Sequence, residues 1–499
     1  MLLYVVFKLF TVVVAYEIQE RALLQPLDHF SGSLSAESQF LQRYFVSDQY
    51  YRPGGPVLIY SVGERTAQAS DLSDGWISEL ARETGGLALL LEQRFYGDSI
   101  PDSTHSNRTD VWRYLSVEQM MADIRQFAEQ INRMAPFRHD RAPVVLVGGS
   151  FAGSIMVWTK QRYPDFESFA IASSAPLKIV DGYWEFDRMV AGRLPCAKAL
   201  SLAVRTIDEI LDREDASQTA ALKRRFGLEH VENDADFVAA LAIQVSALMQ
   251  SAQNKGSIAG YCSYIEPPGA KAVDGVEALA RVTREYGRFH RIVPMGECPG
   301  RSDDLAWLWQ QCTELGMWQT APSPNSSVAA EAAWFAHRLR SRRLDVGHYK
   351  RQCDKCLPLV RNNQPAYRMA QFRIFARRTL DSYTRWVPSD VLLTAGELDP
   401  WLHLTAVQDG GRLTDNTLLI GNASHAEDLL SVVENGGENP EVRNARNKII
   451  QAVEQWSLKH KQRAEHQGYR HVLLVIGSRG IQIGAAFVVL CVLIAKYAH

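Results

Sequence analysis

The chain has 499 residues, of which 46% are hydrophobic and 22% charged, the proportions of a globular protein. They exclude a fibrous or wholly disordered protein, and the length suits two or three domains, or one large α/β core that carries an insertion. Lysine and arginine total 54 against 56 aspartate and glutamate, and no lysine-rich stripe stands out, so no nucleic-acid partner is expected.

The first 15 residues predict a secretory signal peptide. They are apolar apart from Lys8, and Val13 and Ala15 suit the small-residue positions that precede a cleavage point. The polar segment YEIQE follows directly. An uncleaved anchor and an ordinary first strand are the alternatives. Three acceptor sequons for N-glycosylation agree with export, and they begin at Asn107, Asn325 and Asn422.

Residues 16–177 predict the first part of an α/β domain. Short, solidly apolar runs typical of buried strands alternate with helical patterns from about residue 56 onward. The expected strands are residues 57–61, 87–91, 144–147 and 169–172, and the expected helices are residues 116–132 and 154–162. Apolar strands separated by helices indicate a parallel sheet that is covered on both faces.

Residues 178–385 differ in character and predict a helical cap inserted into the α/β domain. Helical patterns follow one another there without intervening strands, at residues 197–210, 235–250 and 276–285. The span also holds six of the seven cysteines, namely Cys196, Cys262, Cys298, Cys312, Cys353 and Cys356. An even number of cysteines in a chain predicted to be secreted indicates disulfides, although six cysteines allow ~15 connectivities.

Cys353 and Cys356 have the spacing of a redox or zinc pair as an alternative. No second pair of this kind and no suitable histidine cluster accompanies them in the sequence. Disulfide bonding is therefore favoured, and neither a metal nor a cofactor is expected.

The α/β pattern resumes in residues 386–464, which predict the second part of the α/β domain. Strands are expected at residues 391–394 and 417–420, and a closing helix is expected at residues 440–461. A polar stalk at residues 465–478 follows.

Residues 479–498 predict a single transmembrane anchor. The apolar run 481–495 is shorter than the ~20 residues that a spanning helix needs, so Arg479 would lie near one interface and snorkel there. Lys496 would then lie on the cytoplasmic side. A removed lipid-anchor signal and a buried terminal helix are the alternatives.

The strongest local signal for chemistry is the glycine-rich segment around Ser150, between a predicted strand and a predicted helix. A nucleophile elbow needs small neighbours, so that the serine Oγ can project from the top of the sheet. The backbone N–H of Phe151, at the start of the helix, would then face a developing oxyanion. The pattern is G-x-S-x-A, because Ala152 stands where glycine is commoner. A glycine-rich turn without chemistry is the alternative.

The order of the downstream residues supports a catalytic triad. α/β-Hydrolases present the serine, then the acid, then the histidine, on loops that follow later strands. Asp399 follows the predicted strand 391–394 and His425 follows the next one, so they are the candidate acid and base. Glu397 competes for the role of the acid, and His403 competes for the role of the base.

Ordered segments from about residue 25 to residue 430 match the pattern of one known family. They are residues 25–30 (QPLDHF), 42–46 (QRYFV), 50–51 (YY), 91–97 (LEQRFYG), 113–116 (RYLS), 118–119 (EQ), 122–123 (AD), 148–150 (GGS), 172–176 (ASSAP), 311–314 (QCTE), 396–401 (GELDPW) and 424–425 (SH). In these segments the chain resembles the prolyl carboxypeptidase and dipeptidyl peptidase II family of serine peptidases (family S28), and within it the thymus-specific serine protease branch most of all. So many ordered segments are far more specific than the serine motif alone.

The resemblance implies an α/β-hydrolase domain interrupted by a helical cap, with the site between them, and no cofactor. It also implies exopeptidase chemistry on peptides with proline beside the scissile bond, often at acidic pH. Ser150, Asp399 and His425 match the positions of the family's triad one by one. Trp401 matches an aromatic residue that helps wall the proline pocket in relatives, with core packing as the alternative.

Three departures from the family pattern limit what the resemblance implies about the substrate. Arg65 stands where relatives usually have a second glycine, and its long cation could alter access or bind a peptide carboxylate. Gln93 replaces a common histidine, which removes a titratable group near the site. A glycan at Asn422, three residues before His425, would crowd the mouth of the site.

The sequence therefore favours a secreted or membrane-tethered serine exopeptidase that acts on proline-containing peptides. A catalytically silent surface protein with a hydrolase fold, and an esterase or lipase, are the alternatives, since fold does not determine the substrate. The choice between carboxypeptidase and dipeptidyl aminopeptidase activity stays open, as does the formation of a homodimer.

Overall fold

The structure is a computed structural model that describes residues 18–31, 39–101, 109–134, 142–250, 255–266, 274–287, 298–299, 303–357, 386–405, 416–431 and 439–478. The predicted signal peptide 1–15, the sequon asparagine Asn107 and the predicted anchor 479–498 lie outside these residues. Among the helices within the described ranges, none is both long enough and apolar enough to span a bilayer.

Eight strands form one sheet, in the order β1-β2-β4-β3-β5-β6-β7-β8. Their bounds are β1 Gln19–Pro26, β2 Gln39–Ser47, β3 Val57–Ser61, β4 Leu87–Leu91, β5 Val144–Gly149, β6 Phe169–Ser173, β7 Val391–Gly396 and β8 Thr417–Ile420. Strand β2 pairs antiparallel with β1 and β4, and all pairs from β4 to β8 are parallel. This order confirms the predicted α/β-hydrolase fold. All six predicted strands are present.

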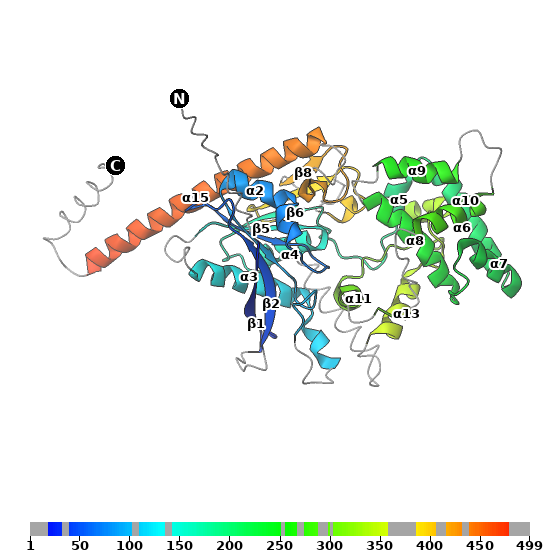
Figure 1. The fold of residues 1–499 in the computed structure, drawn as a ribbon, viewed down its shortest axis with the longest axis horizontal. Helices are drawn as coiled ribbons and strands as arrows, with labels where there is room; N and C mark the ends of the chain where they lie inside the picture. The colour runs from blue at the N-terminus through cyan, green and yellow to red at the C-terminus, as the bar shows by residue number, and fades with distance from the viewer. Residues whose placement is uncertain are drawn as a thin grey trace, which may run out of the picture.

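Helices cover both faces of the sheet. Successive residues of each buried strand point to opposite faces, so each strand contributes side chains to both layers. Leu58, Val145 and Ile171 pack toward α2 (Trp76–Thr84) and α15 (Pro440–Ser478). Their neighbours along the same strands pack toward α3 (Val117–Arg133) and α4 (Ser150–Arg162). In Figure 1 these two helix pairs lie on opposite sides of the strands.

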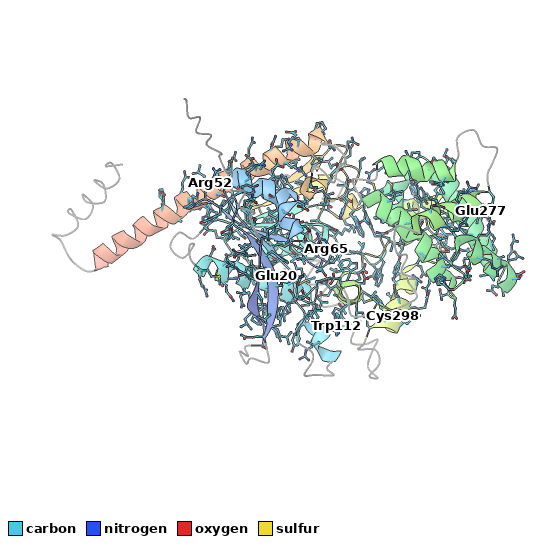
Figure 2. All side chains as sticks on the ribbon, in the orientation of Figure 1. Glu20, Arg52, Arg65, Trp112, Glu277 and Cys298 are labelled. Atoms are coloured by element: carbon cyan, nitrogen blue, oxygen red, sulfur yellow. A yellow bond between two sulfur atoms is a disulfide. The ribbon has the colours of Figure 1, made fainter. Side chains whose placement is uncertain are left out.

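A second core lies beside the sheet, built almost entirely from helices (Figure 1). These helices are α5 Glu185–Ala191, α6 Ala197–Leu211, α7 Ala216–Phe226, α8 Asp234–Gln250, α9 Lys255–Ile265 and α10 Gly275–Gly287. The disulfide Cys196–Cys262 joins the start of α6 to α9. Figure 2 shows Glu277 far out on this helical part, whereas Arg65 lies in the part that contains the sheet.

The later part of the span 178–385 packs differently. Helix α11 (Asp303–Gln310), the π-helical turn η5 (Gln311–Leu315) and helix α13 (Val346–Cys356) contribute apolar side chains to the core of the α/β domain, not to that of α5–α10. Asp303 anchors α11, since its carboxylate accepts hydrogen bonds from the Thr66 backbone N at 2.6 Å and the Gly97 backbone N at 3.0 Å. The span predicted as one cap is therefore divided between two cores.

Two further disulfides hold this later part together, Cys298–Cys356 and Cys312–Cys353. The predicted disulfide bonding is thereby confirmed. The alternative of a redox or zinc pair at Cys353 and Cys356 is wrong, because each sulfur is bonded to a different, distant cysteine. Among the described residues, no group of three histidine, cysteine, aspartate or glutamate side chains could hold a metal ion.

Helix α15 begins at Pro440, where proline is well tolerated in a first helical turn, and continues to Ser478. It passes through residues 465–478, which the sequence predicts as a stalk, and Figure 1 shows it projecting beyond the sheet. Residues 459–467 (KHKQRAEHQ) consist mostly of good helix formers, which explains why the helix does not stop at the predicted residue 461.

Candidate active site

Ser150 lies on a sharp turn between β5 and α4, at the first residue of the helix. Its φ of +54° is rare for a residue with a side chain, and such conformations persist where the surrounding structure enforces them. A Cβ on Gly148 would lie 2.7 Å from the Ala152 carbonyl carbon, so only glycine fits there. Ala152, which stands where glycine is commoner, is completely buried, so its methyl group fits beside the turn. This is the backbone form of a nucleophile elbow.

Asp399 and His425 are in direct contact. Asp399 follows β7 and is fully buried, and its Oδ2 lies 2.9 Å from Nδ1 of His425, which follows β8. The other carboxylate oxygen, Oδ1, accepts a hydrogen bond from the Trp401 backbone N at 2.8 Å. A histidine whose Nδ1–H donates to a buried carboxylate presents Nε2 as its basic atom.

The competing candidates are engaged elsewhere. Glu397 is exposed, and its Oε2 accepts a hydrogen bond from the Asn422 backbone N at 3.0 Å. His403 Nε2 lies 2.9 Å from Nη2 of Arg188. Because arginine only donates, this nitrogen of His403 is an acceptor, and burial and Arg188 lower the pKa of His403.

The loop that carries His425 packs against the serine turn. A Cβ on Gly149 would lie 3.3 Å from the Cβ of Ala426, so the neighbours of Ser150 and His425 are almost in contact. The Ala426 backbone N donates to Oγ of Ser174 at 2.9 Å. Ser174 follows β6, which lies next to β5 in the sheet, so the loops after β5, β6 and β8 converge on one place.

The electrostatic surroundings raise the pKa of His425. Burial by itself lowers it, but the charge and hydrogen bond of Asp399, with smaller contributions from the charges of Glu64 and Asp428, more than offset that effect. Glu64 is half-buried on the loop after β3, and burial raises its own pKa. Sequence reasoning did not identify Glu64 or Asp428 as part of the site.

Asp428 ties the histidine loop to the sheet. Its carboxylate accepts hydrogen bonds from Oγ of Ser173, the last residue of β6, at 2.5 Å and from Oγ1 of Thr394, within β7, at 2.6 Å. Burial raises its pKa, and the two hydroxyl donors partly counter this. An acid three residues after a candidate catalytic histidine is the only sequence signal that points to it.

Trp401 belongs to an aromatic cluster next to the acid. Its ring stacks on Tyr183 with centroids 5.3 Å apart and meets the edge of Phe186 at 5.4 Å. Its Nε1 donates to Oε1 of Gln250 at 2.7 Å, so the hydrogen-bonding end of the indole points to the helical part. The half-buried ring lies between the two cores, in contact with both.

The three departures from the family pattern have defined positions. Arg65 forms a bidentate ion pair with Asp71, with Nη2–Oδ1 at 2.5 Å and Nη1–Oδ2 at 3.1 Å, so its cation is directed to the surface. Gln93 is buried and donates to Oγ of Ser61 at 2.9 Å. Asn422 and Asn325 are both exposed, as a glycosylation site requires.

An α/β-hydrolase sheet with a strained serine turn and a buried aspartate–histidine pair is the arrangement that serine hydrolases of this fold share. The family described as "Serine carboxypeptidase S28" matches residues 25–449. The chain belongs to this family and is a serine-type peptidase.

Relatives resemble the chain over nearly its whole length. The human thymus-specific serine protease is 27% identical over 469 residues, covering 87% of this chain and 86% of the relative. The mouse protein of the same name is 28% identical over 473 residues, with the same coverage. The lysosomal Pro-X carboxypeptidase of Bos taurus is 22% identical over 490 residues and covers 89% of both chains.

Proposed function

We propose that the protein is a serine exopeptidase that hydrolyses peptide bonds next to proline through an acyl-enzyme. Ser150 is the nucleophile, His425 the general base and Asp399 the acid that orients it. The 2.9 Å contact between His425 Nδ1 and Asp399 Oδ2, beside a serine held at φ +54°, is the observation that carries the proposal.

The reaction proceeds in two halves. Ser150 Oγ attacks the scissile carbonyl carbon while His425 Nε2 takes its proton, and the backbone N–H of Phe151 donates to the oxyanion. The protonated histidine then gives the proton to the leaving amine, and an ester joins Oγ to the acyl group. A water molecule, deprotonated by His425, attacks the ester and releases the acid with Ser150 restored.

Preference for proline is proposed from the aromatic cluster. The exposed side of the Trp401 ring offers a flat apolar wall, against which a pyrrolidine ring packs well. The name of the bovine relative, a Pro-X carboxypeptidase, supports the same choice. Whether the free amino or the free carboxyl end of the peptide is accepted depends on the charges around the site.

We also propose that the catalytic part acts in the lumen of the secretory pathway or outside the cell, tethered by residues 479–498. The apolar segment 1–15 and the sequons at Asn107, Asn325 and Asn422 support export. Relatives are named as extracellular and lysosomal enzymes, which agrees with this location.

Labelling by a fluorophosphonate tests the proposal. We expect the purified, folded protein to be labelled, and Ser150→Ala to abolish labelling. Ser217→Ala, which changes an exposed serine on α7, serves as the matched control and keeps full labelling. Absence of labelling in the folded protein would identify a silent binding protein instead.

Two substrate sets then separate the activities. An N-blocked peptide that ends in Pro-X reports carboxypeptidase activity, and a free X-Pro-reporter amide reports dipeptidyl aminopeptidase activity. Hydrolysis of simple esters only, with no cleavage of either peptide, would favour an esterase and contradict the proposed substrate.

A further inference from the structure

A pocket of about 470 Å³ lies behind the loop of the candidate acid and contains none of the three triad candidates. It is bounded by the start of α5, the turn at residues 320–323, the start of α13 and residues 403–404. The volume is within the range of pockets that hold a drug-sized ligand. Nothing in the proposed reaction uses this space.

The pocket is acidic. Three carboxylates line it, those of Glu185, Glu331 and Asp345, against one ammonium group, that of Lys178 at an exposed position. Asp345 is engaged in capping α13, where its Oδ1 accepts a hydrogen bond from the His348 backbone N at 2.7 Å. Glu331 accepts one from the Ser323 backbone N at 2.9 Å.

The surroundings of Glu185 disfavour its negative charge. Its side chain is half-buried, and burial, with the charge of Glu331 added, raises its pKa although Arg188 and Lys178 act in the opposite direction. His403 also lines the pocket but adds no positive charge, because its Nε2 accepts a hydrogen bond from Arg188 and the ring is therefore neutral. A cation in the pocket would therefore stabilise the charge of Glu185.

An aromatic wall accompanies the acids. Tyr183 and Trp184 are both buried and both line the pocket. A guanidinium or ammonium group gains from an aromatic face as well as from a carboxylate, and the aliphatic stem of a basic side chain suits the apolar remainder. Trp184 already has one cation nearby, since the Arg188 guanidinium lies 5.6 Å from its ring centroid.

We propose that this pocket binds a cationic group of a peptide, a guanidinium or ammonium, through Glu185 and the wall formed by Tyr183 and Trp184. The proposal rests on the proposed peptidase function and goes beyond it. The cation is carried either by the substrate itself, at a distance from the scissile bond, or by a separate peptide.

The position of the pocket connects it to catalysis. The hydroxyl of Tyr183 donates to the Pro400 carbonyl at 2.8 Å, and its ring stacks on Trp401, so one side chain touches the loop after Asp399 and lines the pocket. The Leu404 carbonyl, further along this loop, accepts hydrogen bonds from the Leu177 and Lys178 backbone N atoms at 2.7 and 3.0 Å. A ligand there lies one side chain away from the loop that follows the candidate acid.

Binding can be measured without catalysis, in the Ser150→Ala protein, by fluorescence anisotropy of a labelled peptide that carries arginine or the neutral isostere citrulline. We expect the arginine peptide to bind about fivefold more tightly, as one partly buried ion pair with an aromatic contact implies. Adding Glu185→Gln should remove this preference, whereas Glu229→Gln, which changes an exposed glutamate of the helical part, should keep it.

A second variant guards against a folding defect at the start of α5. Lys178→Gln removes the only ammonium of the lining and should strengthen the preference for arginine by about twofold. An unchanged preference in Glu185→Gln, or a weaker one in Lys178→Gln, would overturn the proposal. Failure of the peptidase proposal would show separately, as absent fluorophosphonate labelling of the unmutated protein.

Kinetics of the active enzyme distinguish the two sources of the cation. If the substrate carries it, arginine in place of citrulline at one fixed position lowers KM, and Glu185→Gln removes the effect. If a separate peptide carries it, a non-cleavable arginine peptide changes the rate on a short neutral substrate, and the citrulline peptide does not. Absence of both effects counts against the proposal.

Discussion

At the scale of single residues, the protonation of His425 sets the pH range in which the proposed reaction can run. The histidine must be neutral to accept the proton of Ser150, and its pKa is raised above the ordinary 6.5 by Asp399, Glu64 and Asp428. The free enzyme should therefore lose kcat/KM as the pH falls through a midpoint above 6.5. This places the best activity at neutral rather than acidic pH, unlike what the family resemblance implies.

The contribution of Glu64 to this midpoint is testable. Glu64→Gln removes a negative charge near His425, so the midpoint of kcat/KM should fall by about half a pH unit. Glu454→Gln, an exposed position on α15, is the control and should leave the profile where it is. A midpoint that stays the same in Glu64→Gln would show that this charge does not reach the histidine.

Much of the candidate site could be predicted from the sequence because its members occupy strand ends. Ser150, Asp399 and His425 each follow an apolar run, and in an α/β sheet the carboxyl ends of parallel strands meet at one edge. Glu64 and Asp428 carry no comparable signal. They act through charge across space, and such a contribution depends on burial and distance rather than on spacing along the chain.

At the scale of elements, β1 and β2 are the strands that the sequence did not predict. Strand β1 is at the edge of the sheet that the described residues form, pairs with β2 and leaves most of its residues exposed. Its sequence, QERALLQP, therefore lacks the solid apolar run of the central strands. Buried polar groups hold its end instead.

Arg94 is the centre of these polar groups. It is completely buried, and its Nε and Nη2 donate to the Asp123 carboxylate at 2.6 and 2.7 Å. Its three remaining N–H groups donate to carbonyls, those of Pro26, the last residue of β1, of Leu27 and of Tyr114. His29 Nε2 lies 2.7 Å from the same carboxylate.

Arg94→Met should be strongly destabilising, because it leaves the charge of Asp123 buried without its main partner. We expect a loss of about 3–5 kcal/mol in the free energy of unfolding, measured by urea denaturation. The double variant Arg94→Met/Asp123→Asn should lose less than the sum of the two single variants. A loss no larger than that of the exposed Arg82→Met would contradict the interpretation of Arg94 as the anchor of β1.

At the scale of the whole molecule, the two cores and their disulfides were the least predictable part. The sequence marks residues 178–385 as helical and cysteine-rich, but an amphipathic helix does not reveal which core covers its apolar face. Helix α11 joins the core of the sheet through Trp309, whose Nε1 donates to the Leu115 carbonyl at 3.1 Å, and α13 follows through the Cys312–Cys353 bond. The pairing of six cysteines likewise needs the fold.

One buried acid at this junction makes the stability of the molecule depend on pH. Glu314, on the turn η5, accepts a hydrogen bond from the Val117 backbone N at 2.8 Å, at the start of α3. Burial raises its pKa to about 8, the hydrogen bond lowers it and the charge of Glu118 adds to the increase. In the unfolded chain the same carboxyl has its ordinary pKa of 4.5.

The sign of the effect follows from proton binding. Between about pH 4.5 and about pH 8 the folded protein holds a proton that the unfolded chain has released, so stability falls as the pH rises through this window. Glu314→Gln keeps the acceptor for Val117 and carries no charge, so unfolding in urea should become less dependent on pH. At pH 8 the free energy of unfolding of this variant should exceed that of the unmutated protein by on the order of 2 kcal/mol. The control Glu129→Gln, which changes an exposed residue of α3, should show no such gain. Equal slopes of stability against pH in all three proteins would mean that Glu314 is ionised in the folded state, with its charge compensated by the amide donors at the start of α3.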